Sequence, residues 1–362
     1  MSRKLTMLLV LAAGLASFTA NADPYPPLEQ HTFLHDGIER EYFVHVPRGR
    51  EIELPVVLAI HGYGSTATGF AAFHDLNEHA DRNGYIVVYP QGSHFASTNE
   101  QGRYRVTSWN LLGNAVPDLS QGPQCTDDAY IYPCPPECGE CGRCGWASCY
   151  DDLGYFAKLL DDLEAKYSTD RTRYYALGMS NGGMMVLRLG CSMSGRFAAI
   201  APISAQLPAG YDCGPTTPLP MLHLTGGLDD TVRPDGKPGG DGFIYVSSAK
   251  TAESWAHALD CDGAPVAWKT EESELAGVVC TAYTDCAEPG QEVVSCVDTD
   301  ETHNWPARRP GGAWPTCVTS QQAEAMPEQK LCEPRTEYGP HRGMDLIWDF
   351  FSRYRQPGIQ SE

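Results

Sequence analysis

The sequence lacks an apolar run long enough to cross a membrane, and it is poor in basic residues. Its longest apolar stretch, residues 5–18, falls short of the roughly 18 or more residues of a membrane-spanning helix. Lysine and arginine together number 26 against 46 aspartates and glutamates, a formal net charge of −20. Surfaces that bind nucleic acid or anionic lipid must be basic, so we expect neither nucleic-acid nor membrane partners.

The first residues have the pattern of a secretory signal peptide. Arg3 and Lys4 precede the apolar stretch, and Ala20–Ala22 gives an A-x-A cleavage site. We therefore predict a signal peptide over residues 1–22, removed before Asp23. The alternative is a membrane anchor, but no stop-transfer charges follow, and the absence of cysteine after the cleavage site argues against lipidation. These features predict a secreted protein, extracellular or periplasmic.

The chain contains 14 cysteines, and in an exported protein an even number favours disulfides. The C-x-x-C spacing near residue 140 also suits a zinc site, but an oxidising compartment favours a loop held by disulfides. The pairing there stays open; elsewhere we expect Cys191–Cys213 and Cys261–Cys286. Six of the cysteines lie in a Pro- and Gly-rich insertion at about residues 111–149: Cys125, Cys134, Cys138, Cys141, Cys144 and Cys149.

Apolar runs and helical periodicity alternate along the rest of the chain. A β-hairpin is expected around Asp36-Gly37. Alternation of strands and helices predicts an α/β fold with a mostly parallel sheet and helices on both faces, in a single catalytic domain over residues 23–362. The expected strands are Pro55–Ile60, Gly84–Tyr89, Arg173–Leu177, Phe197–Ile203, Met221–Thr225 and Glu292–Cys296. The expected helices are Leu153–Tyr167, Met184–Leu189, Ser247–Leu259 and Met344–Tyr354.

A serine between glycines, in Gly178-Met179-Ser180-Asn181-Gly182, matches the G-x-S-x-G pattern of a nucleophile elbow. The pentapeptide is weak evidence by itself in a chain with 36 glycines. Its setting between an expected buried strand and an expected helix is what the elbow requires. The sequence therefore predicts that Ser180 is a nucleophile.

A nucleophilic serine needs a base to take its proton, and an acid to orient that base. In α/β-hydrolases the acid and then the histidine follow the serine, each after a strand. Asp229 and Asp230 follow one expected strand, and we choose Asp229. His303 follows the next, and we prefer it to His341, which precedes the last expected helix.

The remaining roles follow from the same logic. His61 lies in a turn and His223 inside a strand, so both are expected to be structural. An oxyanion hole needs two backbone N–H donors. We assign these to Asn181, after the nucleophile, and to Tyr63, in the loop after the first expected central strand. No metal and no cofactor is expected.

Several sequence blocks together resemble one family. They are "LAIHGYGS", "GYIVVYPQG", "SWN", "DDLGYF", "GMSNGGMM", "GGLDDTV" and "HNWP", spread between residues 56 and 306. This combination is similar to the secreted esterases that include feruloyl esterases, acetylxylan esterases and poly(3-hydroxybutyrate) depolymerases. The resemblance implies an α/β-hydrolase fold and a metal-free Ser-His-Asp mechanism. It also implies roles for Asp229, His303 and Tyr63 that agree with the assignments above.

The chain departs from this family in two places that affect substrate preference. Asp300–Thr302 stands where glycines commonly precede the histidine, and the cysteine-rich insertion is unusually long. The leading hypothesis is an exported, monomeric serine esterase acting on feruloyl or acetyl esters of plant polysaccharide, with Trp109 and Trp305 as aromatic walls for the substrate. Polyester depolymerisation is the alternative within the family. A non-catalytic module of the same fold and a peptidase are alternatives of other kinds, but no triad member is missing and no gating domain is visible.

Overall fold

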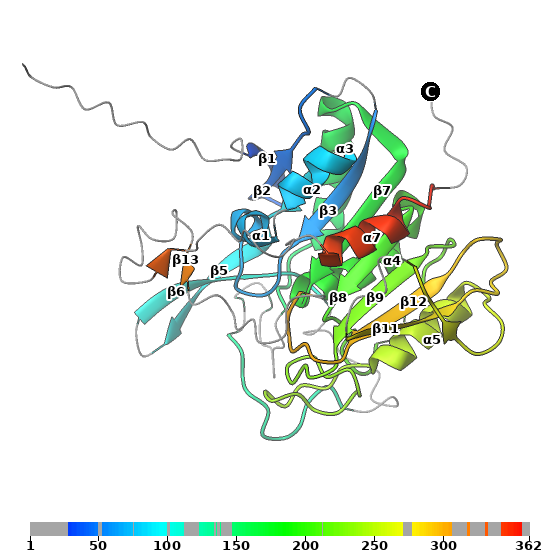
Figure 1. Ribbon diagram of the computed structural model, residues 1–362. Coiled ribbons are helices and arrows are strands. Elements are labelled where there is room, and N and C mark those ends of the chain that lie inside the picture. Colours follow the sequence, from blue (N-terminus) through cyan, green and yellow to red (C-terminus); the bar gives the residue numbers. More distant parts are fainter. Residues whose placement is uncertain are drawn as a thin grey trace, which may run out of the picture.

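The central feature of the fold is a ten-stranded sheet with helices on both faces (Figure 1). The computed structural model describes residues 28–49, 53–74, 76–99, 102–111, 123–133, 135, 138, 147–211, 213–270, 277–305, 317–318, 330–331 and 342–356. The predicted signal peptide lies outside these residues.

Six neighbouring strands at the centre of the sheet run parallel, in the order β4-β3-β7-β8-β9-β12. Antiparallel strands extend both edges, β2 and β1 beyond β4, and β11 and β10 beyond β12. The sheet strands are β1 (Glu29–His35), β2 (Ile38–His45), β3 (Leu54–Ile60), β4 (Ile86–Pro90), β7 (Thr169–Met179), β8 (Ala199–Ile203), β9 (Met221–Gly226), β10 (Val266–Ala267), β11 (Val278–Tyr283) and β12 (Val293–Asp298).

The helices divide between the two faces because successive strand side chains point in opposite directions. In β3, Val57 and Ala59 join the core beneath one set of helices, whereas Val56, Leu58 and Ile60 join the core beneath the other. The first set is α1 (Ala67–His74), α2 (Leu76–Asn83) and α7 (Arg342–Phe351), and the second is α3 (Asp152–Lys166), α4 (Asn181–Met193) and α5 (Ser248–Ala258). The predicted α/β-hydrolase architecture is therefore confirmed.

Local sequence explains several element boundaries. Asp36 and Gly37 have φ values of 54° and 75°, so the predicted hairpin turns with two left-handed residues, which Asp and Gly tolerate best. Asp151 caps α3, where its side chain accepts a hydrogen bond from the Gly154 amide at 3.0 Å. The expected strands and helices agree with the observed elements apart from small differences at their ends.

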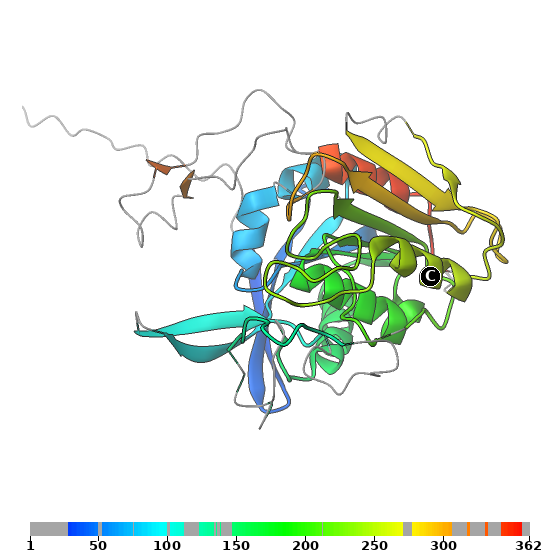
Figure 2. The same ribbon diagram turned by 90° about the horizontal axis from the view of Figure 1, so that it is seen from below.

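A second hairpin, β5 (Ser93–Asn99) and β6 (Gly102–Ser108), was not predicted. Figures 1 and 2 both show it standing out from the body of the molecule. Two strands that pair only with one another have no need of the apolar alternation that marks a buried strand, so the sequence gives little sign of them. The two short strands β13 (Cys317–Val318) and β14 (Lys330–Leu331) also pair only with each other.

Four disulfides join described cysteines. The expected pairs Cys191–Cys213 and Cys261–Cys286 are present. A third, Cys280–Cys296, links directly opposite residues of β11 and β12. Within the insertion Cys138 is bonded to Cys149, so it cannot also ligate zinc as a thiolate. Cys134, Cys141 and Cys144 lie outside the described residues.

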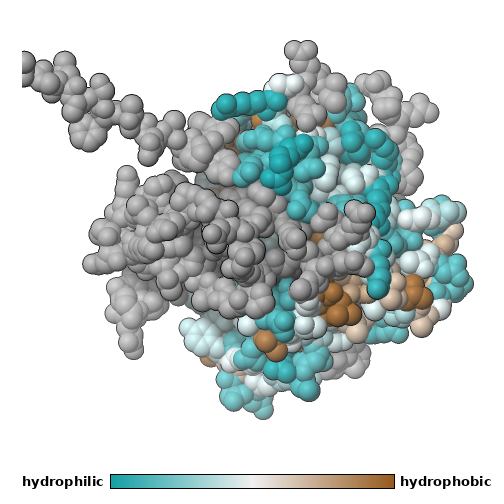
Figure 3. All heavy atoms as spheres, in the orientation of Figure 1, coloured by the Kyte–Doolittle hydropathy of each residue, from teal (hydrophilic) through white to brown (hydrophobic). Residues whose placement is uncertain are grey.

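Where the face shown in Figure 3 is coloured, it is mostly hydrophilic, with small apolar patches. This agrees with the acidic composition. Among the described residues, no helix is both long and apolar enough to cross a membrane.

Candidate active site

Ser180 lies in a sharp turn between β7 and α4. Its φ of 56° and ψ of −126° place a non-glycine residue in a strained conformation of the kind that marks functional sites. Its amide donates to the Ile203 carbonyl at 2.9 Å, and its carbonyl accepts from the Met184 amide at 2.9 Å. The turn is thus held by β8 on one side and by the first turn of α4 on the other.

The glycines of the pentapeptide are needed for close packing. A Cβ on Gly182 would lie 2.2 Å from the Ile60 carbonyl oxygen, and one on Gly178 would lie 2.6 Å from the Gly182 oxygen. The Ile60 oxygen cannot move freely, because Ile60 belongs to β3 at the centre of the sheet. A side chain at Gly182 would push α4 away from β3, and one at Gly178 would push α4 away from β7, so Ser180 would move in either case.

His303 lies between the serine and an aspartate. Its Nε2 is 2.8 Å from the Ser180 Oγ, and its Nδ1 is 2.8 Å from the Asp229 Oδ2. The Asp229 side chain is fully buried, and its other oxygen accepts from the amides of Thr231 and Val232, each at 2.8 Å. These two amides fix the carboxylate with one oxygen facing the imidazole.

The neighbouring Asp230 takes a different position. Its side chain is 74% exposed and pairs with Arg233 at 3.1 Å, so it does not meet the imidazole. The other histidine considered, His341, lies outside the described residues. Of the residues proposed from sequence for the triad, the structure brings together Ser180, His303 and Asp229.

The loops that carry the acid and the histidine are tied to one another. The Gly227 amide donates to the Asp298 carbonyl at 2.7 Å, and the Leu228 amide to the Glu301 carbonyl at 2.9 Å. Glu301 lies in the Asp300–Thr302 stretch that departs from the glycines common in the family. Its carboxylate accepts hydrogen bonds from the Thr302 amide and the Asn304 side chain. Glu301 therefore holds the residues on either side of His303 in place.

The loop after β3 borders the serine. A Cβ built on Gly62 would lie 3.4 Å from the Ser180 Cβ, so the backbone one residue before Tyr63 borders the serine. His61 holds this loop: its Nδ1–H donates to the Gly62 carbonyl at 2.8 Å, and its Nε2 accepts from the Gly92 amide at 2.9 Å. Burial lowers the pKa of His61 to about 4, so the ring stays neutral and can accept that bond near pH 7.

Comparisons with known proteins find similarity to esterases. No family model matches the chain. It is 28% identical over 286 residues to a protein named "Putative esterase NocK" from Nocardia uniformis, covering 75% of this chain and 68% of that protein. It is 26% identical over 144 residues to feruloyl esterase B of Piromyces equi, covering 38% of this chain and only 26% of that protein.

Among solved structures, the acetyl xylan esterase from Aspergillus awamori shares the fold, with a TM-score of 0.50 and 17% identity. The likeness covers 78% of this chain and 95% of that one. The chain is thus similar to esterases and has the α/β-hydrolase fold. The predicted enzyme class, a carboxylic ester hydrolase, is confirmed by these relatives.

The two tryptophans proposed for the substrate do not line an open cleft in this esterase. Trp109 is fully buried; its Nε1–H donates to the His61 carbonyl at 2.8 Å and its amide to the Asn181 Oδ1 at 2.9 Å. Trp305 is 4% exposed and packs against His74 and Phe70 of α1. Both therefore support the loops of the site from behind and are not walls that a substrate could touch.

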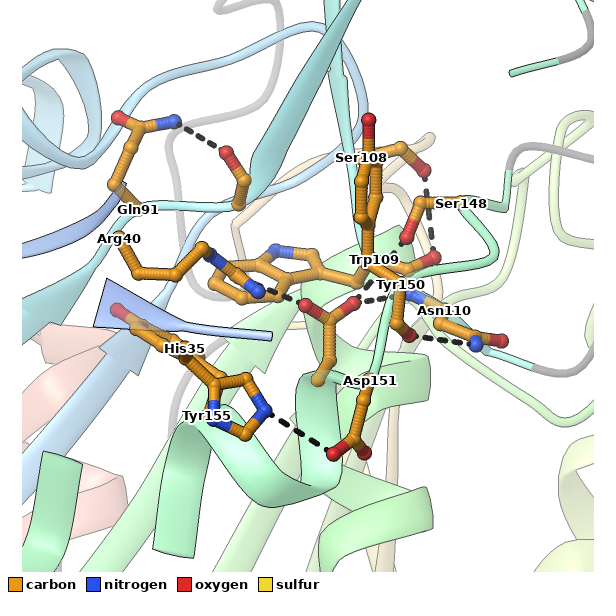
Figure 4. Close-up of polar contacts among 12 residues, drawn as sticks. His35, Arg40, Gln91, Ser108, Trp109, Asn110, Ser148, Tyr150, Asp151 and Tyr155 are labelled. Carbon is orange, nitrogen blue, oxygen red and sulfur yellow. Dashed lines mark hydrogen bonds and ion pairs between the residues drawn. The ribbon is translucent and has the colours of Figure 1, made fainter. Parts of the chain in front are cut away.

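A buried ion pair made by Arg40 was not foreseen from sequence (Figure 4). The Arg40 Nη2 lies 2.7 Å from the Asp152 Oδ1, and the two side chains are 4% and 0% exposed. The Asp152 Oδ2 accepts from the Asn110 amide at 2.7 Å, and the Arg40 guanidinium lies over the Tyr155 ring, 3.9 Å from its centre.

This pair holds the segment that contacts the residue after Ser180. Asn110 follows Trp109, whose amide binds the side chain of Asn181, the residue after Ser180. A continuous line of contacts thus runs from β2 and α3 to the start of α4. The only sequence sign was Asp152 itself, a carboxylate at the start of an apolar helix in "DDLGYF", which also fits an ordinary helix N-terminus.

Proposed function

We propose that this chain is an exported serine esterase working through an acyl-enzyme. The observation that supports this most strongly is the pair of 2.8 Å contacts that place the His303 imidazole between Ser180 Oγ and Asp229 Oδ2. The three groups come from loops after β7, β9 and β12, in the order that this fold uses for a Ser-Asp-His set.

In the first half of the reaction, the Ser180 hydroxyl gives its proton to the His303 Nε2 as its oxygen attacks the ester carbonyl carbon. The carbonyl oxygen takes the electron pair and becomes an oxyanion, for which the Tyr63 and Asn181 amides are the proposed donors. Collapse of this intermediate breaks the bond to the alcohol oxygen, which receives the proton from His303. The acyl group remains on Ser180.

In the second half, water repeats the same steps. It gives a proton to His303, attacks the acyl carbon, and releases the acid while Ser180 regains its proton. Asp229 keeps the imidazole Nδ1–H directed toward itself, so that Nε2 faces the serine, and it stabilises the imidazolium formed in each half. No step requires a metal or cofactor.

For the substrate, we propose a feruloyl or acetyl ester carried on plant polysaccharide, cleaved outside the cell. The named relatives that act on such esters support this, as does the export signal expected from residues 1–22. A screen with methyl ferulate, acetylated xylan and a hydroxybutyrate polymer tests the choice. If the protein cleaves the hydroxybutyrate polymer alone, polyester depolymerisation replaces the proposed substrate.

The serine mechanism is tested by Ser180→Ala in the oxidised, purified protein. Losing the nucleophile of such a triad costs about 10⁶-fold in kcat, so hydrolysis of p-nitrophenyl acetate should fall to background. The matched control is Ser352→Ala, an exposed serine whose hydroxyl binds only the nearby Asp349 carbonyl. If Ser180→Ala keeps more than a few per cent of activity with unchanged melting, Ser180 is not the nucleophile and the mechanism is wrong. If the wild-type protein hydrolyses none of the substrates, a non-catalytic role of the fold replaces the proposal.

A further inference from the structure

Ser204, the residue directly after β8, has a strained backbone. It is 1% exposed and its φ is 45°, in the left-handed region that residues other than glycine seldom adopt. Of the four described non-glycine residues with a positive φ, Asp36 and Asp260 lie in turns, and aspartate tolerates this conformation. The other two are Ser204 and the nucleophile, Ser180. A strained residue of this kind persists only where its surroundings fix it, so its contacts are informative.

The end of β8 is bonded to the segments that carry all three members of the triad. The Ile203 carbonyl accepts from the Ser180 amide at 2.9 Å. The Ser204 amide donates at 2.8 Å to the carbonyl of Leu224, in β9, the strand that leads to the loop of the acid. The Ser204 hydroxyl donates at 3.1 Å to the carbonyl of Asn304, the residue after the catalytic histidine. Two successive residues thus join the three segments whose separations the triad requires.

The catalytic histidine depends on backbone contacts for its position, because its segment has no regular structure. His303 lies in a bend outside any helix or strand. The Asn304 amide donates to the Thr302 carbonyl at 2.8 Å, which closes the backbone tightly around His303. Fixing the Asn304 carbonyl therefore fixes the backbone of the histidine, and with it the point from which the imidazole reaches Ser180 and Asp229.

This contact matters most once the acyl-enzyme has formed. The free Ser180 hydroxyl lies 2.8 Å from the His303 Nε2, but in the proposed acyl-enzyme that oxygen carries the acyl group and has no proton to share. The imidazole is then held by Asp229 and by its own backbone. A displacement of about 1 Å at a catalytic group can cost about 100-fold in rate, so the backbone must be fixed independently of the substrate.

We propose that Ser204 is a positioning residue for the catalytic histidine. Its hydroxyl ties the end of β8, which holds the turn of Ser180, to the loop that carries His303. This deepens the proposed function and rests on it. At 1% exposure the Ser204 side chain cannot touch a substrate, so it acts through the loop alone. Its strained backbone is kept because both its amide and its hydroxyl are bound.

The test measures kcat and KM for p-nitrophenyl acetate in two variants. Ser204→Ala removes the hydroxyl. Ser204→Gly also removes the Cβ that strains the backbone at a positive φ, so it tests the hydroxyl even if the alanine variant folds poorly. Both variants should lower kcat roughly 10-fold or more, and KM should not rise. Rates are expressed per site that a fluorophosphonate labels at completion, so that unfolded protein is not counted.

The matched control is Ser194→Ala, at another serine that is 1% exposed. Ser194 lies before the start of β8, and its hydroxyl oxygen accepts from the amides of Thr216 and Thr217 at 3.2 and 3.1 Å. Its loss removes buried hydrogen bonds as Ser204→Ala does, but no member of the triad is attached to it. Thermal melting should fall, and kcat per labelled site should stay within about twofold because the histidine loop is untouched.

Three outcomes would overturn the proposal. The first is a kcat for both Ser204 variants close to that of the wild type. The second is a normal kcat for Ser204→Gly but not for Ser204→Ala, which would assign the effect to strain and not to the hydroxyl. The third is an equal loss of kcat in the Ser194→Ala control. In each case wild-type hydrolysis that depends on Ser180 would leave the esterase proposal standing. If the wild type hydrolyses no ester, or if Ser180→Ala retains activity, the proposed function itself fails.

Discussion

The ion pair between Arg40 and Asp152 should be far more important to stability than the salt bridges on the surface. Asp152→Asn leaves the Arg40 guanidinium, 4% exposed, without a counter-charge. Breaking a buried pair in this way costs about 3–5 kcal/mol of unfolding free energy. The face of Tyr155 remains to stabilise the cation by about 1 kcal/mol, so we expect a net loss near the lower end of that range.

The reverse change, Arg40→Met, leaves the Asp152 carboxylate with bonds from the Asn110 amide and the Ser148 hydroxyl at 2.7 and 3.3 Å. Those donors keep part of the charge satisfied, so the loss should be smaller than for Asp152→Asn. In the double variant Arg40→Met/Asp152→Asn, neither charge is stranded. Its cost should therefore be about 2 kcal/mol or more below the sum of the single costs.

The assay is equilibrium unfolding in denaturant of the four proteins in the cycle, with disulfides intact. A matched surface cycle uses Lys250→Met and Glu253→Gln, whose side chains lie 3.0 Å apart and are 60% and 59% exposed. Exposed pairs of this kind couple by about 0.2–1 kcal/mol. A coupling for Arg40 and Asp152 no larger than that of the surface pair would refute the reasoning.

Two further predictions concern the triad and pH. Asp229→Asn should lower kcat about 10⁴-fold, as loss of the correct imidazole tautomer does in a serine triad. The control Asp230→Asn, on a side chain 74% exposed, should leave kcat within twofold. Comparable losses of kcat in both variants would contradict the choice of acid. Burial lowers the pKa values of His61 and His223 to about 4, so below pH 6.5 the unfolded chain binds protons that the folded one does not. Their contribution, up to about 3 kcal/mol each, is complete above pH 6.5 and is lost as pH falls toward 4. Unfolding curves between pH 7 and 4 should show this decline, and His223→Gln should make it shallower; a flat profile would contradict it.

The parallel centre of the fold could be predicted because its strands are continuous apolar runs, and a strand buried on both faces leaves that mark in the sequence. The positions of Ser180, Asp229 and His303 followed from the ends of those strands. The role of Trp109 could not be predicted, because the sequence does not distinguish a tryptophan in a core from one that lines a cleft. The Cys280–Cys296 pair required knowing that β11 and β12 place those two residues opposite one another.

The Arg40–Asp152 pair could not be predicted for a related reason. Arg40 lies in an edge-side antiparallel strand and Asp152 begins a helix more than 100 residues later, so each by itself reads as a solvated charge. Only the packing of α3 against that side of the sheet removes both from water. The ring contacts of Tyr132 with Tyr63, Tyr130 and Phe243 likewise depend on where an insertion without periodicity packs, so the sequence does not predict them.

The cross-strand disulfide has a consequence for how this protein can be produced. Among the described residues, the sheet continues beyond β12 only through β11 and the two-residue strand β10, and Val279 of β11 is 59% exposed. Such a margin is a template on which a second chain can add its own strand. The bond from Cys280 to Cys296 fixes β11 in place and prevents it from peeling away or shifting its register. A chain made in a reducing cytoplasm would keep the parallel strands that carry Ser180 and His303 but would lack this disulfide. We therefore expect it to aggregate through its edge strand before it loses activity.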